Sequence, residues 1–269
     1  MSANIYRHEL RSRIRSVAVW SLGVTALLLV FFSFFTVFAD QAALMNQTMA
    51  KFPPELRAAF SMDNHDLSTV LGFYSFIFLF VQLCLAIQAA NYGVGLVSIE
   101  ETELTADFLL SKPVSRTQVL TSKLLAAFTS LGSTALVVAI TSVAAINWVR
   151  GERSYDVGTL ALLLISVVIF QLFFLSVGLV ISLLVKRVRS VTPYGLGLGF
   201  GAYVLSAFSG VIGDVKLELI TPFKHLDAAY IVQHGAYDTP LLLLNVGVTV
   251  LSLAASYWLY RRRDIQAVS

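Results

Sequence analysis

The residues of this chain that could carry chemistry are few, and one compact group of them is acidic. Four carboxylates lie within eight consecutive positions: Glu100, Glu101, Glu103 and Asp107. Ser98 precedes them and has the capping-box spacing to Glu101, so we expect a new helix to begin there. The dipole of such a helix favours negative charge in its first turns. The pattern therefore predicts a short helix that offers an acidic surface to a partner.

The same segment has an apolar side and a defined end. Its apolar residues, which need cover, are Leu104, Phe108, Leu109 and Leu110. Pro113 stops the predicted helix. Ser115 and Gln118 then repeat the capping box and start the next helix, whose first turn holds Arg116. We predict a short, rigid, two-capped elbow over residues 98–121.

The sequence lacks the common motifs for catalysis and nucleotide binding. It contains no HExxH, no G-x-S-x-G and no Walker A pattern. Asp214 has no second intramembrane Asp with which to form a protease dyad. His225 and His234 have no third ligand at metal spacing, so we expect solvated loop histidines. We predict no catalytic residue, no metal site and no cofactor in this chain, and energy for directional work must come from another polypeptide.

Six long stretches without Asp, Glu, Lys or Arg must position these residues. They run from Ser16 to Ala39, Leu67 to Ile99, Leu124 to Val149, Val157 to Val185, Ser190 to Gly213, and Thr239 to Tyr260. A helix of roughly 20 residues crosses the bilayer hydrocarbon, and buried soluble helices are seldom this long. The composition agrees, with 57% hydrophobic residues and a mean hydropathy of +0.77. We predict an all-α polytopic membrane protein with six transmembrane helices in one domain, residues 1–269.

Positive charge predicts the orientation. The side that holds both termini carries 13 of the 19 Lys and Arg residues, so we expect both termini in the cytoplasm. The basic residues 1–15 have near-helical apolar spacing, which is typical of an interfacial helix; a frayed basic tail is the alternative. The apolar run that follows is too long for a cleaved signal peptide.

Polar side chains inside the expected spans are few and are not ionisable. The amides among them are Gln82, Gln88, Asn91, Gln171 and Asn245. Proton-coupled and voltage-coupled machines place ionisable groups at membrane depth, so this pattern argues against an ion-coupled pump or antiporter. We expect the amides to form hydrogen bonds between helices.

Glycine recurs at every second position in the fifth expected span. Gly195 and Gly199 form one G-x-x-x-G pair, and Gly197 and Gly201 form another on a different face. Two close helix contacts are therefore possible, one within the subunit and one with a partner subunit. Packing within the subunit alone is the alternative.

An extracytoplasmic loop is expected over residues 214–238. Thr221 is a plausible N-cap, Pro222 suits the first helical position and Gly235 can end the helix. This helix is either re-entrant or interfacial at the exit of a pathway, or a surface helix half buried on the outer leaflet. The sequence leaves both interpretations open.

Two segments resemble a known family. The run from Glu100 to Arg116, with Lys123 following, resembles the cytoplasmic signature of type-two ABC exporter permeases, although Leu104 replaces the usual Gly and Ala106 a common Leu. The run from Thr221 to Tyr230 is similar to a Ser-Pro-Phe-Lys-Tyr-Phe-Asp stretch that such permeases carry before the last span. The span count and the inside termini match along essentially the whole chain.

The resemblance implies a function. It implies a permease that forms a translocation pathway as a homodimer or heterodimer in a prokaryotic plasma membrane, with two cytoplasmic ATPase subunits that bind ATP and Mg²⁺. The elbow would be the coupling helix seated in an ATPase groove. Its coupling residues would be Glu100, Glu101, Glu103, Asp107, Leu109, Leu110, Pro113 and Arg116. A non-transporting scaffold or sensor subunit and a passive channel are the alternatives. The spans show no charged pocket that would select a substrate.

Overall fold

The computed structural model describes most of the chain and is helical. It describes residues 2–41, 44, 47–48, 51–53, 57, 65–102, 114–185, 188–212 and 216–262. Within these ranges every regular element is a helix and none is a strand. The predicted all-α class is therefore confirmed.

Among the described residues, five helices are long and apolar enough to cross a membrane. They are α1 (Ala3–Ser33) together with α2 (Phe35–Asp40), then α5 (Val70–Thr102), α7 (Arg116–Val149), α8 (Val157–Leu184) and α12 (Thr239–Arg262). The helix α9 (Thr192–Ile212) occupies the place of the remaining expected span and is not one of the five. The chain is a multi-pass membrane protein, while the exact number of crossings stays a prediction.

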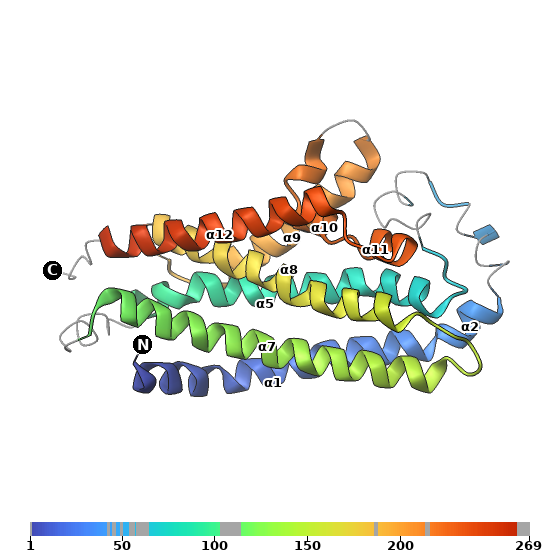
Figure 1. The fold of residues 1–269 in the computed structure, drawn as a ribbon, viewed down its shortest axis with the longest axis horizontal. Coiled ribbons are helices and arrows are strands. Elements are labelled where there is room, and N and C mark those ends of the chain that lie inside the picture. Colours follow the sequence, from blue (N-terminus) through green and yellow to red (C-terminus); the bar gives the residue numbers. More distant parts are fainter. Residues whose placement is uncertain are drawn as a thin grey trace.

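The long helices run side by side along one axis (Figure 1). The start of α1 and the end of α12 lie at the same end of the bundle, and α2 lies at the opposite end. We call the first of these the elbow end, because α5 ends and α7 begins there, and the second the far end. The first turns of α1 and the last turns of α12 thus lie at one end of the bundle, while an even number of crossings and the cytoplasmic side of this end stay predictions.

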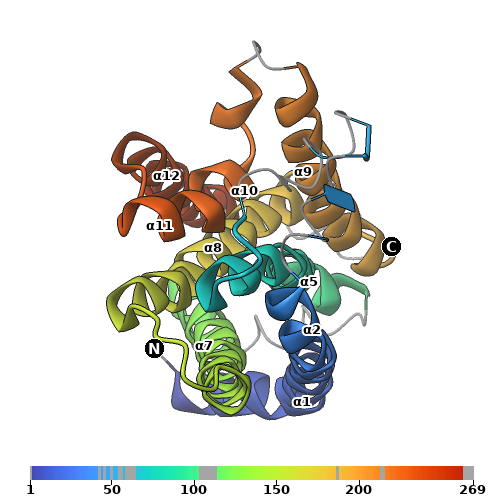
Figure 2. The same ribbon diagram turned by 90° about the vertical axis from the view of Figure 1, so that its right-hand side faces the viewer.

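The helix α5 lies between the other helices and packs against α8, α9 and α1 (Figure 2). Small residues permit its close approach to α8. A Cβ on Gly178 would lie 2.8 Å from the carbonyl oxygen of Ala90, and a Cβ on Gly93 would collide with the backbone of Leu175. Such contacts let helix backbones come close and gain van der Waals packing in a membrane.

Two of the five intramembrane amides bridge helices, as expected, and a third bonds a backbone carbonyl that lies outside the long helices. The amide of Gln88 donates to Thr134 Oγ1 on α7 at 2.9 Å, and Asn245 Nδ2 on α12 lies 3.4 Å from His225 Nδ1. Gln82 Nε2 donates to the carbonyl oxygen of Leu226 at 2.9 Å. Among the described residues, Nε2 of Gln171 is buried without a hydrogen-bond partner.

Candidate functional site

The predicted elbow lies partly outside the described residues. Of its predicted coupling residues, five fall outside: Glu103, Asp107, Leu109, Leu110 and Pro113. Glu100 and Glu101 belong to the last turn of α5, which extends to Thr102. Their proposed roles therefore stay predictions, and the site is described through the two helices that flank the elbow.

The helix boundary expected at Ser98 was wrong. The helix α5 passes through Ser98 without a break, and the Ser98 hydroxyl donates to the carbonyl oxygen of Val94 at 2.7 Å. A helix that is already propagating needs no new cap, because each added residue gains a backbone hydrogen bond at little entropic cost. The serine bonds back to residue i−4 instead, as serines inside helices do.

The second capping box is present, at the start of α7. The backbone N–H of Gln118 donates to Ser115 Oγ at 3.2 Å, and the backbone N–H of Ser115 donates to Gln118 Oε1 at 3.2 Å. Arg116 follows and donates from Nη1 to the carbonyl oxygen of Tyr260 at 3.5 Å. The start of α7 is thus capped locally and tied to the last turns of α12.

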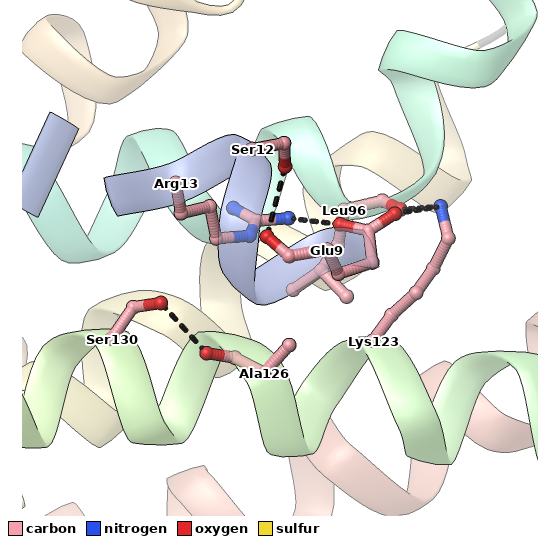
Figure 3. A network of polar contacts seen from close by, with 7 residues as sticks. All are labelled: Glu9, Ser12, Arg13, Leu96, Lys123, Ala126 and Ser130. Carbon is pink, nitrogen blue, oxygen red and sulfur yellow. Dashed lines mark hydrogen bonds and ion pairs between the residues drawn. The ribbon is translucent and has the colours of Figure 1, made fainter. Parts of the chain in front are cut away.

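Lys123, about two turns further along α7 than Arg116, lies in a buried polar network (Figure 3). Its side chain is only 3% exposed. The ammonium donates to the carbonyl oxygen of Leu96 near the end of α5 at 2.6 Å, and lies 3.6 Å from Glu9 Oε1. The second oxygen of Glu9 accepts a hydrogen bond from Arg13 Nη2 at 3.0 Å. The Glu9 carboxylate is therefore shared between two cations, one on α1 and one on α7.

The first turns of α1 make further contacts with both helices that flank the elbow. The backbone N–H of Ser2 donates to Ser122 Oγ on α7 at 2.8 Å. Tyr92 on α5 donates from its hydroxyl to Ser16 Oγ at 3.0 Å, and the Arg13 guanidinium lies 5.1 Å from the centre of the Tyr92 ring. Figure 2 shows this part of α1 lying across the end of the bundle beside α7.

These contacts join the ends of α1, α5 and α7 at the elbow end. A buried charge that loses its partner destabilises a protein by about 3–5 kcal/mol, so Lys123 is stable in its buried position only with its acceptors in place. The acceptors belong to α5 and α1, whereas Lys123 belongs to α7. The ends of three helices are therefore held in register beside the elbow. Glu9, which holds two of them, was not singled out from the sequence, although it is the only acidic residue before Asp40.

The glycines of α9 divide into two faces, as their spacing predicts. A Cβ on Gly195 would collide with Asn91, and one on Gly199 would lie 2.8 Å from the Ile87 side chain, so this pair packs on α5. A Cβ on Gly197 or Gly201 would meet no described residue within 4 Å. One pair thus serves packing within the subunit, and the other faces away from the part of the chain that the structure describes.

A comparison with known families decides the identity of the chain. Residues 3–265 match the ABC-2 family transporter protein family. The chain belongs to this family. It is the transmembrane permease subunit of an ABC transporter, and membership implies association with ABC ATPase subunits. A search of curated proteins finds no match.

The second family motif of this ABC-2 permease enters the bundle. It forms α10 (Pro222–His225) and α11 (Ala228–His234), which follow the short helix η2 (Lys216–Leu219). The Phe223 side chain is 3% exposed, and its ring packs against Phe170 and Phe174 of α8 and Tyr203 of α9. The Leu226 carbonyl accepts its hydrogen bond from Gln82, near the middle of α5. Phe223 and Leu226 lie among the spans, so the alternative of a surface helix half buried on the outer leaflet does not fit these two residues.

The local chemistry of this motif differs from the expectation in two places. Thr221 precedes α10 and Pro222 opens it, but the Thr221 hydroxyl donates to the carbonyl oxygen of Ala202 instead of capping the helix. Asp227 interrupts the expected single helix and caps α11, which ends at Gly235 with φ of 60°.

The prediction of a solvated His225 was wrong. The residue is 2% exposed, and Nε2 lies 3.2 Å from the carbonyl oxygen of Leu219. Its other ring nitrogen faces Asn245 on α12. His225 is buried because the segment that carries it inserts between helices, which its sequence does not show. His234 is exposed, as expected.

Proposed function

We propose that this ABC-2 permease is the membrane half of an ATP-driven exporter, works as a dimer, and is driven by separate cytoplasmic subunits that bind ATP and Mg²⁺. The observation that supports it best is the network around Lys123. It joins the helices on both sides of the elbow, so a push on the elbow moves α5 and α7 together. The resemblance of two segments to exporter permeases supports export as the direction of transport.

The packing of α5 offers a route from the elbow to a pathway. The helix packs along α8 and α9 and touches the inserted motif through Gln82. A displacement of its elbow end would therefore reach the inserted motif, which lies between the spans. We propose that the inserted motif lines or closes the exit of the pathway.

A direct test of ATP coupling alters the elbow itself. Replacing Glu100, Glu101 and Glu103 with Lys reverses the charge offered to an ATPase groove, and Leu109→Asp removes an apolar anchor. We expect normal membrane levels of both variants, with loss of ATPase co-purification and of permease-dependent ATP hydrolysis. If the ATPase still binds and its hydrolysis still responds to the permease, the coupling assignment fails and a scaffold role gains support.

We propose that the dimer forms through the Gly197 and Gly201 face of α9, because this face has no neighbour among the described residues. Replacing both glycines with Leu should prevent a close contact between α9 and a second copy, and should reduce crosslinked dimer in native membranes. Replacing Gly195 and Gly199 instead should perturb packing on α5, and so lower the yield of folded protein. Full dimer yield in the Gly197 and Gly201 variant would exclude this face.

The orientation is tested by labelling single cysteines in a Cys84→Ser background. A cysteine in place of Ser115, at the elbow end, should be shielded from an impermeant thiol reagent in intact cells. One in place of Asp238, at the far end, should be labelled. Labelling of the cysteine at position 115 from outside would reverse the orientation drawn from the charges.

A further inference from the structure

Glu9 lies on α1, yet its side chain contacts Lys123, a residue that follows the elbow in the sequence. Its carboxylate lies 3.6 Å from the ammonium of Lys123, and the same ammonium is bonded to the Leu96 carbonyl before the elbow. Its side chain is 16% exposed, and those of Arg13 and Lys123 are 9% and 3% exposed. Water screens such a pair much less than it screens a surface pair.

Further contacts join the first turns of α1 to the other helices at the elbow end. Arg13 joins Glu9 to the Tyr92 ring on α5, and Ser2 meets Ser122 on α7. The first turns of α1 therefore touch the helix before the elbow and the helix after it. From there α1 continues as one helix to Ser33, and α2 carries the span to Asp40 at the far end (Figure 1). A helix transmits displacement along its axis, since every backbone hydrogen bond lies within it.

We propose that Glu9 is a positioning residue that makes the first turns of α1 move as one body with the elbow, so that ATPase motion reaches the first span as well as α5 and α7. The inference rests on the proposed function. The alternative is that the first turns of α1 stay fixed in the membrane interface while the elbow moves past them. In the fixed case the contacts of Glu9 and Ser2 would have to break in every cycle.

The two cases are separated by breaking the charge contact and then restoring the connection covalently. Glu9→Gln keeps the shape of the side chain and removes its charge. Ser2→Cys with Ser122→Cys allows a disulfide where the two residues now meet, in a Cys84→Ser background with any tag at the C-terminus. Asp40→Asn is the matched control, because it removes the charge of an exposed pair with Arg153, 2.7 Å long, at the far end.

The measurement uses the full-length permease in native-lipid nanodiscs with the ATPase that co-purifies with the wild type. We expect Glu9→Gln to retain the ATPase but to lower permease-dependent ATP hydrolysis about fivefold or more, as the loss of an ordinary coupling energy does. Oxidation of the cysteine pair should restore hydrolysis in the Glu9→Gln background and leave it unchanged when Glu9 is present. Asp40→Asn should hydrolyse ATP as the wild type does.

Three outcomes would overturn the proposal. These are unchanged hydrolysis in Glu9→Gln, a disulfide that fails to restore hydrolysis, and a disulfide that stops hydrolysis while Glu9 is present. The last result would show that the segment must move against α7. Absence of any co-purifying ATPase would count against the proposed function instead. In that event the rate of disulfide formation in the permease alone still tests the contact, since Glu9→Gln should slow it.

Discussion

At the elbow end, α1, α5 and α7 are joined by charged side chains, whereas at the far end the motif from Thr221 to Tyr230 is held by aromatic rings and neutral hydrogen bonds. The charged contacts are few and depend on Glu9 and Lys123. The far-end contacts include the Phe223 ring and the Leu226 carbonyl. An ion pair can be displaced with its helices and formed again, while an aromatic side chain seated among others is costly to remove. We therefore expect changes at the elbow end to affect the proposed coupling most, and changes at the far end to affect stability most.

The largest effect should come from the far end. Phe223→Ala removes a buried ring from a cluster of three others and should lower the free energy of unfolding by about 3–5 kcal/mol. Thermal unfolding in detergent measures this loss. Phe34→Ala, at a position that is 53% exposed, is the control and should change little. Equal effects of the two variants would show that the inserted motif does not carry stability.

A second effect at the far end depends on pH. His65 precedes α5, and burial, opposed by Asp227 and assisted by Lys224, lowers its pKa to about 4. The ring is neutral in the folded protein. Its Nδ1 donates to Ser75 Oγ at 2.7 Å, because that hydroxyl donates to the Gly72 carbonyl.

As the pH falls, the unfolded chain takes up the His65 proton near its ordinary pKa of about 6.5, before the folded protein does. The contribution of neutral His65 is therefore fully present above pH 6.5 and is lost progressively down to about pH 4. The loss is on the order of 3 kcal/mol. Unfolding of the detergent-solubilised protein across this range should depend less on pH in His65→Gln. The same slope in both proteins would remove His65 from the explanation.

A smaller effect is expected at the elbow end. Lys123→Met keeps the length of the side chain but removes the donor to Leu96, and leaves Glu9 paired with Arg13. The free energy of unfolding should fall by about 1–3 kcal/mol. Permease-dependent ATP hydrolysis should fall by a larger factor than stability predicts, and Lys123→Arg should recover part of it. A loss of hydrolysis that only follows the loss of folded protein would contradict a coupling role.

The sequence predicts the spans well because a single physical quantity sets them. Charge-free runs end where helices leave hydrocarbon, so the expected span from Val157 to Val185 agrees with α8 to within one residue. The two faces of the α9 glycines also follow from their spacing. Local patterns failed where a larger structure overrode them, as at Ser98, where α5 propagates through a serine that could have capped a new helix.

Contacts between distant segments had no local signal. The sequence places Glu9 in a basic segment and Lys123 in a family motif, and nothing in their spacing predicts that they meet. His225 was expected in water because the sequence around it predicts a loop outside the membrane. Only the packing of Phe223 and Leu226 on α8 and α5 explains its burial.

The smallest effect should come from the charged pair at the far end, which also tests whether the two ends differ by burial and not by charge alone. Arg153 and Asp40 form an ion pair of 2.7 Å, but their side chains are 38% and 68% exposed. Exposed pairs contribute about 0–1 kcal/mol, because water and salt screen them. Asp40→Asn should therefore shift the unfolding temperature little at low salt and not at all at high salt. Lys123→Met should keep its effect at both salt concentrations, because its partners are buried. If both variants respond to salt alike, then burial does not distinguish the elbow end from the far end.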